Sequence, residues 1–171
     1  MRKISILGIL FVLLGMSGFG LSQPLNNFKP GSEPDGFGDI KWGTHLSTLK
    51  NMKVLGVDPS YGGIDIYLRL GEISGIGGAR FRNIEYQFWK GKFSGVCIIT
   101  EGASEYGTLK EAVFEIFGKG GKPYKDQEYY VWDGESTLMT LECHPVGERA
   151  LFWMMDKSIL TRMELEDKPN P

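Results

Sequence analysis

The sequence predicts an α+β fold in which an antiparallel sheet carries two helices packed on one face. Apolar residues alternate with other residues in several segments between residues 64 and 156, and many of them are β-branched, which is typical of strands. Two other segments repeat their apolar residues at the helical period. No segment requires the crossover that parallel strands need, so neighbouring strands can pair as antiparallel meanders. The predicted order is one helix and three strands, occurring twice.

The first half is predicted to begin with a short helix. Thr44 can accept a hydrogen bond from an unpaired amide at the helix start, and Leu46, Leu49 and Met52 then fall on one helix face. Apolar alternation predicts three strands after this helix, and the last two form a hairpin: Ile64–Leu70, Phe81–Phe88 and Val96–Thr100.

The second half has the clearest helix signal in the chain. Thr108 and Glu111 match a capping box, apolar residues recur from Leu109 to Phe117, and Gly118 follows where a helix stop belongs. Three further strands are predicted after it: Gln127–Trp132, Thr137–His144 and Arg149–Asp156.

The N-terminus has the pattern of a secretory signal peptide. Arg2 and Lys3 supply positive charge, Ile4–Met16 contains no charged residue, and small residues follow up to Ser22. We expect cleavage after Ser22 and export to the periplasm or the medium, with no stable membrane insertion afterwards. The alternative is an uncleaved membrane anchor. No cysteine follows the expected cleavage point, which argues against a lipoprotein.

Four segments are expected along the chain. Residues 1–22 form the signal peptide, and residues 23–38 are rich in proline and glycine and are expected to be a flexible leader. Residues 39–165 form a single α+β domain, and residues 166–171 form a disordered tail.

Charge and motifs exclude several classes of function. The chain has 19 Lys and Arg against 21 Asp and Glu, which disfavours binding to nucleic acid and to anionic membranes. The glycine-rich segment Gly75–Arg80 lacks the third glycine of a dinucleotide fingerprint, and Gly118–Pro123 follows a helix instead of preceding one. We therefore expect no cofactor.

No catalytic or metal site is expected either. The soft metal ligands are few and separated, and the acidic residues are not grouped as in a calcium loop. Nothing around Cys97 or Cys143 resembles the surroundings of a catalytic cysteine. These two cysteines form a disulfide if their strands are neighbours, and otherwise remain two separate thiols.

Aromatic residues exceed what a sheet covered on one face requires. Tyr129–Trp132 and Leu151–Met155 are apolar on both sides of their strands. One interpretation is an exposed aromatic surface for a partner, made of Trp89, Tyr130, Trp132 and Trp153. The other is that the leader or the long loops fold over these residues.

Short segments along the chain carry a resemblance to a group of uncharacterised small exported bacterial proteins: Ile40–Thr44, Trp89–Phe93, Leu109–Ala112, Phe117–Gly118 and Lys122–Tyr124. The layout of helix and strands is also similar to that of the β-lactamase inhibitor protein and of the outer-membrane assembly lipoproteins. The resemblance implies binding to other proteins through sheet and loop surfaces. The chain lacks the lipidated cysteine of the lipoproteins and the full cysteine set of the inhibitor.

Taken together, the sequence favours an exported, non-catalytic module that binds a protein or a component of the cell envelope. The alternative is a small periplasmic hydrolase or ligand-binding protein with a pocket between helices and sheet.

Overall fold

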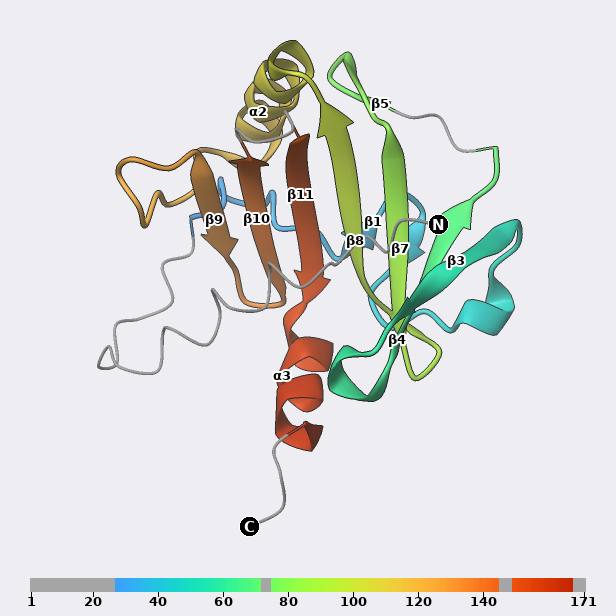
Figure 1. The fold of residues 1–171 in the computed structure, drawn as a ribbon. Helices are drawn as coiled ribbons and strands as arrows, with labels where there is room; N and C mark the ends of the chain where they lie inside the picture. The colour runs from blue at the N-terminus through green and yellow to red at the C-terminus, as the bar shows by residue number, and fades with distance from the viewer. Residues whose placement is uncertain (1–26, 72–74, 145–148, 168–171) are drawn as a thin grey trace.

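The computed structural model describes residues 27–71, 75–144 and 149–167 (Figure 1). Its centre is a seven-stranded sheet of strand order β3-β4-β7-β8-β11-β10-β9, in which every neighbouring pair is antiparallel. The strands are β3 (Met52–Asp58), β4 (Ile64–Arg69), β7 (Asn83–Trp89), β8 (Lys92–Glu101), β9 (Tyr129–Asp133), β10 (Thr137–His144) and β11 (Arg149–Asp156).

The smaller elements lie before, between and after these strands. They are β1 (Gly36–Phe37), β2 (Ile40–Lys41), β5 (Gly75–Ile76), β6 (Ala79–Arg80), the helices α2 (Ala103–Phe117) and α3 (Lys157–Glu166), and the 3-10 turns η2 (Leu46–Thr48) and η3 (Ser60–Gly62). The predicted α+β class with an antiparallel sheet is confirmed.

Two meanders meet in the middle of the sheet. One runs through β3, β4, β7 and β8, and the other runs through β9, β10 and β11. The last strand of each meander therefore pairs with the last strand of the other. In this pairing Cys97 lies opposite Trp153 and Ile98 lies opposite Phe152. The most buried strands are therefore central, and β3 and β9 are left at the two edges.

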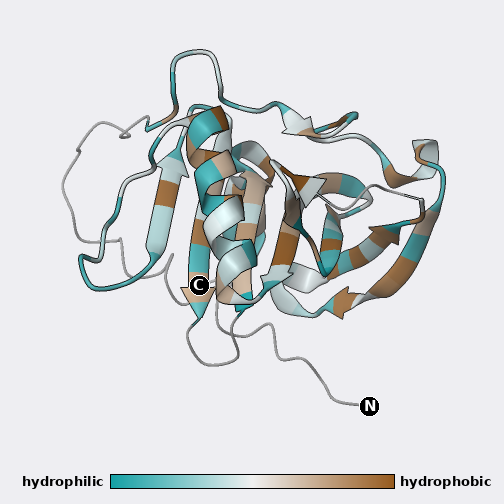
Figure 2. Ribbon diagram, turned by 90° about the horizontal axis from the view of Figure 1, so that it is seen from above, coloured by the Kyte–Doolittle hydropathy of each residue, from teal (hydrophilic) through white to brown (hydrophobic). Residues whose placement is uncertain are grey.

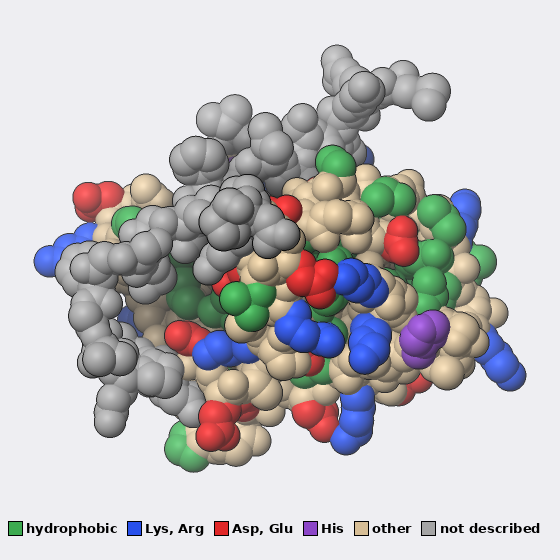
Figure 3. Space-filling model, turned by 90° about the horizontal axis from the view of Figure 1, so that it is seen from below, with side chains coloured by type: hydrophobic (Ala, Val, Ile, Leu, Met, Phe, Trp, Pro, Cys, Tyr) green, Lys and Arg blue, Asp and Glu red, His purple; other side chains and the backbone are tan. Residues whose placement is uncertain are grey.

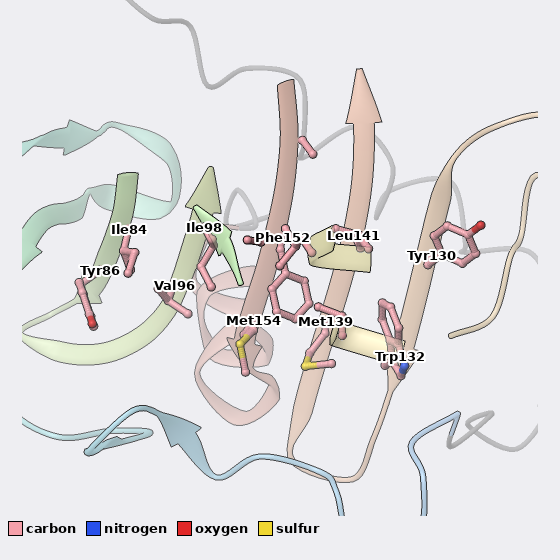
Figure 4. Close-up of a cluster of buried hydrophobic side chains, with 14 of the residues drawn as sticks. Ile84, Tyr86, Val96, Ile98, Tyr130, Trp132, Met139, Leu141, Phe152 and Met154 are labelled. Carbon is pink, nitrogen blue, oxygen red and sulfur yellow. The ribbon is translucent and has the colours of Figure 1, made fainter. Parts of the chain in front are cut away.

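The main core lies on the face of the sheet that α2 covers. Val96 and Ile98 of β8 and Phe152 of β11 face Leu109 and Val113 of α2 in one cluster of buried side chains, part of which Figure 4 shows. The spacing of the apolar positions in α2 accounts for this packing, and the helix carries hydrophilic as well as hydrophobic residues (Figure 2).

Residues 27–50, which we call the strap, complete this core. Phe28 and Ile40 are buried in the same cluster as α2, and Phe37 and Trp42 pack against it. The amide of Lys29 donates to the carbonyl of Phe117 at the end of α2, at 2.7 Å. Residues 23–38 were expected to be flexible, but their described part, from residue 27, packs on the protein.

Several elements differ from the sequence prediction. The helix α2 begins at Ala103, one turn and more before the expected capping box of Thr108 and Glu111. The helix expected around Leu46–Met52 is only the 3-10 turn η2, and Met52 begins the edge strand β3. A helix, α3, follows β11 directly and was not predicted. Its residues Ile159 and Met163 pack with Ile64 and Trp89 in a cluster separate from the main core, so the second helix of the fold is C-terminal.

The expected signal peptide, residues 1–22, lies outside the described residues. Within the described ranges, α2 and α3 are both too short and too polar to cross a lipid bilayer.

Candidate functional site

The four aromatic residues that suggested a partner surface are all buried. Trp89, Tyr130, Trp132 and Trp153 are each at most 5% exposed, so the interpretation as an exposed surface needs correction. Tyr130 and Trp132 contact the ring of Phe114 in α2, with centroids 5.0 and 6.0 Å away. On the face of the sheet that carries Tyr130 and Trp132, the other interpretation is the better one, because α2 and the strap cover these side chains.

Trp89 and Trp153 are buried in two other clusters. The indole Nε1 of Trp89 donates to the carbonyl of Tyr61 at 2.9 Å, and α3 packs on the ring. Trp153 packs with Cys97 and Ile99 on the face of the sheet opposite to α2, and its own Nε1 has no hydrogen-bond partner in the described part of the chain. Neither side chain presents an aromatic surface to solvent in this structure.

The two cysteines remain free thiols. Cys97 packs beside Trp153, whereas Cys143 packs against the main core on the other face of the sheet, and β11 lies between their strands. A disulfide across this arrangement is excluded because the Cβ atoms would have to lie about 4 Å apart. Burial raises the pKa of both thiols, most strongly for Cys97, so both are protonated at neutral pH.

A dense polar cluster surrounds Glu128, just before β9. Its carboxylate accepts hydrogen bonds from the Tyr106 hydroxyl at 2.8 Å, from Lys110 at 2.9 Å and from Lys122 at 3.2 Å. The bonds from Lys110 and Tyr106 lower the pKa of Glu128 to about 2. The hydrogen bond to Glu128 also raises the pKa of Lys110, which therefore stays charged. The cluster ties α2 to β9 and offers no free base or nucleophile.

Metal ligands do not gather in the described part of the chain, where no group of three or more His, Cys, Asp or Glu side chains is placed to hold an ion. His45 instead caps η2, accepting from the amide of Ser47. The most distinctive feature of the molecule that remains is the difference between its two sheet edges.

One edge of the sheet is covered, and the other is open as far as the described residues show. Along β9, the amide of Gly121 donates to the carbonyl of Val131 at 2.7 Å, and the amide of Val131 donates back to Gly121 at 2.8 Å. Along β3, β4 is the sole neighbouring strand among the described residues. An open edge presents unpaired amides and carbonyls to which another strand can add.

Exposed apolar side chains accompany the open edge. Val54, Leu55 and Val57 of β3 are 62%, 48% and 60% exposed, and Leu70, just after β4, is also exposed. We call β3 together with Leu70 the β3 edge. Hydrophobic side chains gather over this end of the sheet, at the right of Figure 3. Such a contiguous group of apolar residues is a signal for an interaction site.

The backbone of β3 is oriented for pairing on its outer side. The amide of Leu70 donates to the carbonyl of Asn51 at 2.8 Å, which fixes the phase of the β3–β4 ladder. Hydrogen-bonded and non-hydrogen-bonded pairs alternate along an antiparallel ladder. Since Asn51 and Leu70 form a hydrogen-bonded pair, Val54 and Tyr67, three positions further along, form a non-hydrogen-bonded pair. The N–H and C=O of Val54 therefore point away from β4. Sequence reasoning missed this strand because a β-bulge at Leu55 breaks its alternation.

Comparisons of the chain with known protein families, with curated proteins and with solved structures find no match. The resemblance to small exported bacterial proteins therefore stays a prediction.

Proposed function

We propose that the chain is an exported, non-catalytic module that binds an extended segment of a protein by strand addition to the β3 edge. The observation that supports this function is the asymmetry of the sheet. Gly121 covers β9, whereas no described segment pairs with the outer side of β3, which carries exposed Val54, Leu55 and Val57. Main-chain hydrogen bonds would supply affinity and the apolar side chains would supply selectivity.

A binding function also agrees with the packing beneath α2. Leu109 and Val113 of the helix and Phe152 of β11 are fully buried there, and apolar side chains fill the contact between helix and sheet where a pocket enzyme would hold its substrate. The ionisable groups beside this contact, Lys110 and Glu128, neutralise each other. We therefore favour the binding module over the small periplasmic hydrolase.

Export is part of the same proposal. The cationic start and the uncharged run Ile4–Met16 support a signal peptide, which would bring the domain to the periplasm or the medium. A protein or another envelope component exposed there is the expected partner.

The test is a selection of random twelve-residue peptides on the immobilised protein. We expect the selected peptides to alternate apolar and polar residues and to slow amide exchange in β3 when they bind. Val54→Pro removes an amide that points away from β4, so it should weaken binding by at least about tenfold while leaving the fold intact. Val54→Thr is the matched control, because it keeps both the amide and a β-branched side chain.

Equal binding by wild type and Val54→Pro would show that the peptides bind elsewhere and would overturn the proposal. Loss of binding in both variants would show that the Val54 side chain, and not strand addition, determines affinity, which also contradicts the mechanism.

A further inference from the structure

We propose that the β3 edge pairs with the β3 edge of a second copy of the chain, antiparallel, with Val54 opposite Val57 and Lys53 opposite Asp58. This inference rests on the proposed function, because it names one partner for the same edge. It depends on three properties of β3: which face each side chain occupies, which charges meet, and how much surface the strand offers.

The bulge in β3 places the matching side chains on the same face. Val54 lies opposite Tyr67 and Val57 lies opposite Asp65 on β4, and these two β4 residues share a face because they are two positions apart. In a strand without a bulge, Val54 and Val57 would lie on opposite faces, since they are three positions apart. The extra residue, Leu55, brings them together.

The other face of β3 follows the same rule. Lys53 lies opposite Leu68 and Asp58 lies opposite Ile64, which are four positions apart on β4 and share the face opposite to Tyr67. Residues that face each other across an antiparallel pair must share a face. A single antiparallel register therefore places Val54 opposite Val57 and Lys53 opposite Asp58. The two-fold axis of the dimer generates each of these pairs twice.

The charges in this register are complementary. Lys53 is exposed and has no ion-pair partner within the described residues, so it is available to a carboxylate of the second copy. Asp58 accepts the amide of Ser60 at 2.9 Å through Oδ1, and its other oxygen has no hydrogen-bond partner in the described part. Opposite charges directly across a strand pair stabilise the pair, and like charges destabilise it.

The contact area predicts a weak dimer. One strand of seven residues on each side buries less than the roughly 1,200 Å² that stable complexes need, so we expect a dissociation constant on the order of micromolar or weaker. Val54 and Val57, which are 62% and 60% exposed in the single chain, would be partly covered on pairing and would supply the apolar part of the contact.

The experiment is sedimentation equilibrium of the purified protein across a range of concentrations around the micromolar scale. We expect a reversible dimer that weakens as salt is added, because the charge pairs are screened. Lys53→Glu should weaken it at least about tenfold and reverse its salt dependence, since two like-charged pairs replace two opposite ones. Lys125→Glu, in the exposed segment before β9, is the control with the same change in net charge.

Mixing two variants gives the sharpest test. Lys53→Glu makes an edge with two negative residues, and Asp58→Lys makes an edge with two positive residues, so each should be monomeric and the mixture should form a heterodimer. Asp58→Lys also removes the acceptor for Ser60. If this variant does not fold, the reversed salt dependence of Lys53→Glu carries the test.

The outcomes separate this inference from the proposed function. A wild type that stays monomeric at every concentration but binds selected peptides at β3 overturns self-pairing and leaves the proposed function standing. A dimer that Lys53→Glu does not affect overturns the register. If both charge variants weaken the dimer and the protein binds no peptide at β3, self-pairing is supported. The strand that adds to the β3 edge is then the β3 strand of a second copy and not a segment of another protein.

Discussion

The indole Nε1 of Trp42 donates a hydrogen bond to Oγ1 of Thr137 at 2.8 Å, joining residues that lie 95 positions apart in the chain. The Thr137 hydroxyl in turn donates to the carbonyl of Pro34 at 2.7 Å. Beside it, the Glu33 carboxylate accepts the backbone amides of Ser136 and Thr137 at 2.6 and 2.9 Å. These contacts fasten the strap to the turn between β9 and β10, so the N-terminal segment is part of the fold.

Replacing Glu33 with glutamine should therefore destabilise the protein. Burial opposes ionisation of Glu33, but hydrogen bonds from three backbone amides outweigh it and lower the pKa of the carboxyl group. We expect Glu33→Gln to lower the free energy of unfolding by about 1–2 kcal/mol in urea titrations, because charge-assisted bonds are lost and an amide group then faces amide donors.

Asp35→Asn is the matched control for Glu33→Gln. Asp35 pairs with Lys41 at 2.7 Å, but the two side chains are 76% and 77% exposed, so the change should cost much less stability than Glu33→Gln. Equal losses for the two variants would contradict the anchoring of the strap by Glu33.

Stability should also fall in acid through Glu128. The folded pKa is about 2 and lies below the usual 4.5, so this carboxylate stabilises the fold fully above pH 4.5 and the contribution disappears as pH falls toward 2. Because 41% of the side chain is exposed to solvent, we expect a contribution of only about 1 kcal/mol.

Urea titrations of wild type and Glu128→Gln between pH 2.5 and 6 check this prediction. The difference between the two proteins should be largest near pH 6 and should shrink as the pH falls. Glu111→Gln removes the same charge from an exposed position on α2 and serves as control. A difference that stays constant with pH would show that the hydrogen bonds of Glu128 do not depend on its charge.

The parts of the fold that could be predicted are those with regular, buried alternation. The predicted bounds Thr137–His144 and Arg149–Asp156 coincide with β10 and β11, because central strands place an apolar residue on the core at every second position. The strap could not be predicted, since its anchors Phe28 and Ile40 are isolated among prolines and glycines and have no period.

The candidate site was harder to predict than the fold. The aromatic residues in Leu151–Met155 predict an exposed partner surface, whereas tertiary packing buries them on both faces of β11. The open edge lies instead in Met52–Asp58, where a bulge removes the alternation and the apolar residues are valines and a leucine. Which strand is left at an edge depends on the order of the strands, which a single sequence does not specify.

The packing around Trp132 can be tested by a glycine-to-alanine substitution at Gly120, with the same substitution at Gly107 as the control. A Cβ on Gly120 would lie 2.8 Å from the Trp132 ring, so Gly120→Ala should destabilise the protein by about 1–3 kcal/mol through overpacking. A Cβ on Gly107, within α2, would meet no atom within 4 Å, so Gly107→Ala should stabilise it by about 0.5–1 kcal/mol. Thermal unfolding measures both, and stabilisation by both changes would contradict the packing of Trp132.

Export makes a prediction about the mature N-terminus. If Ile4–Met16 is the apolar part of a signal peptide, the exported protein should begin at Gln23, which N-terminal sequencing and intact mass can determine. Leu10→Arg should abolish export by placing a charge within the apolar run, whereas Leu25→Arg, beyond the expected cleavage point, should not. A membrane-bound product that retains Met1 would indicate the uncleaved anchor instead.

Export to an oxidising compartment should leave both cysteines reduced. Cys97 and Cys143 lie on opposite faces of the sheet with β11 between their strands, so no local motion brings their sulfurs together. Under denaturing, non-reducing conditions we expect two titratable thiols per chain. In the native state Cys143 should react slowly with a thiol reagent, because its pKa is raised, and the fully buried Cys97 should react only on unfolding. Cys143→Ser should then remove the native reaction and leave one thiol after unfolding, while an intramolecular disulfide in the wild type would contradict the strand order of the sheet.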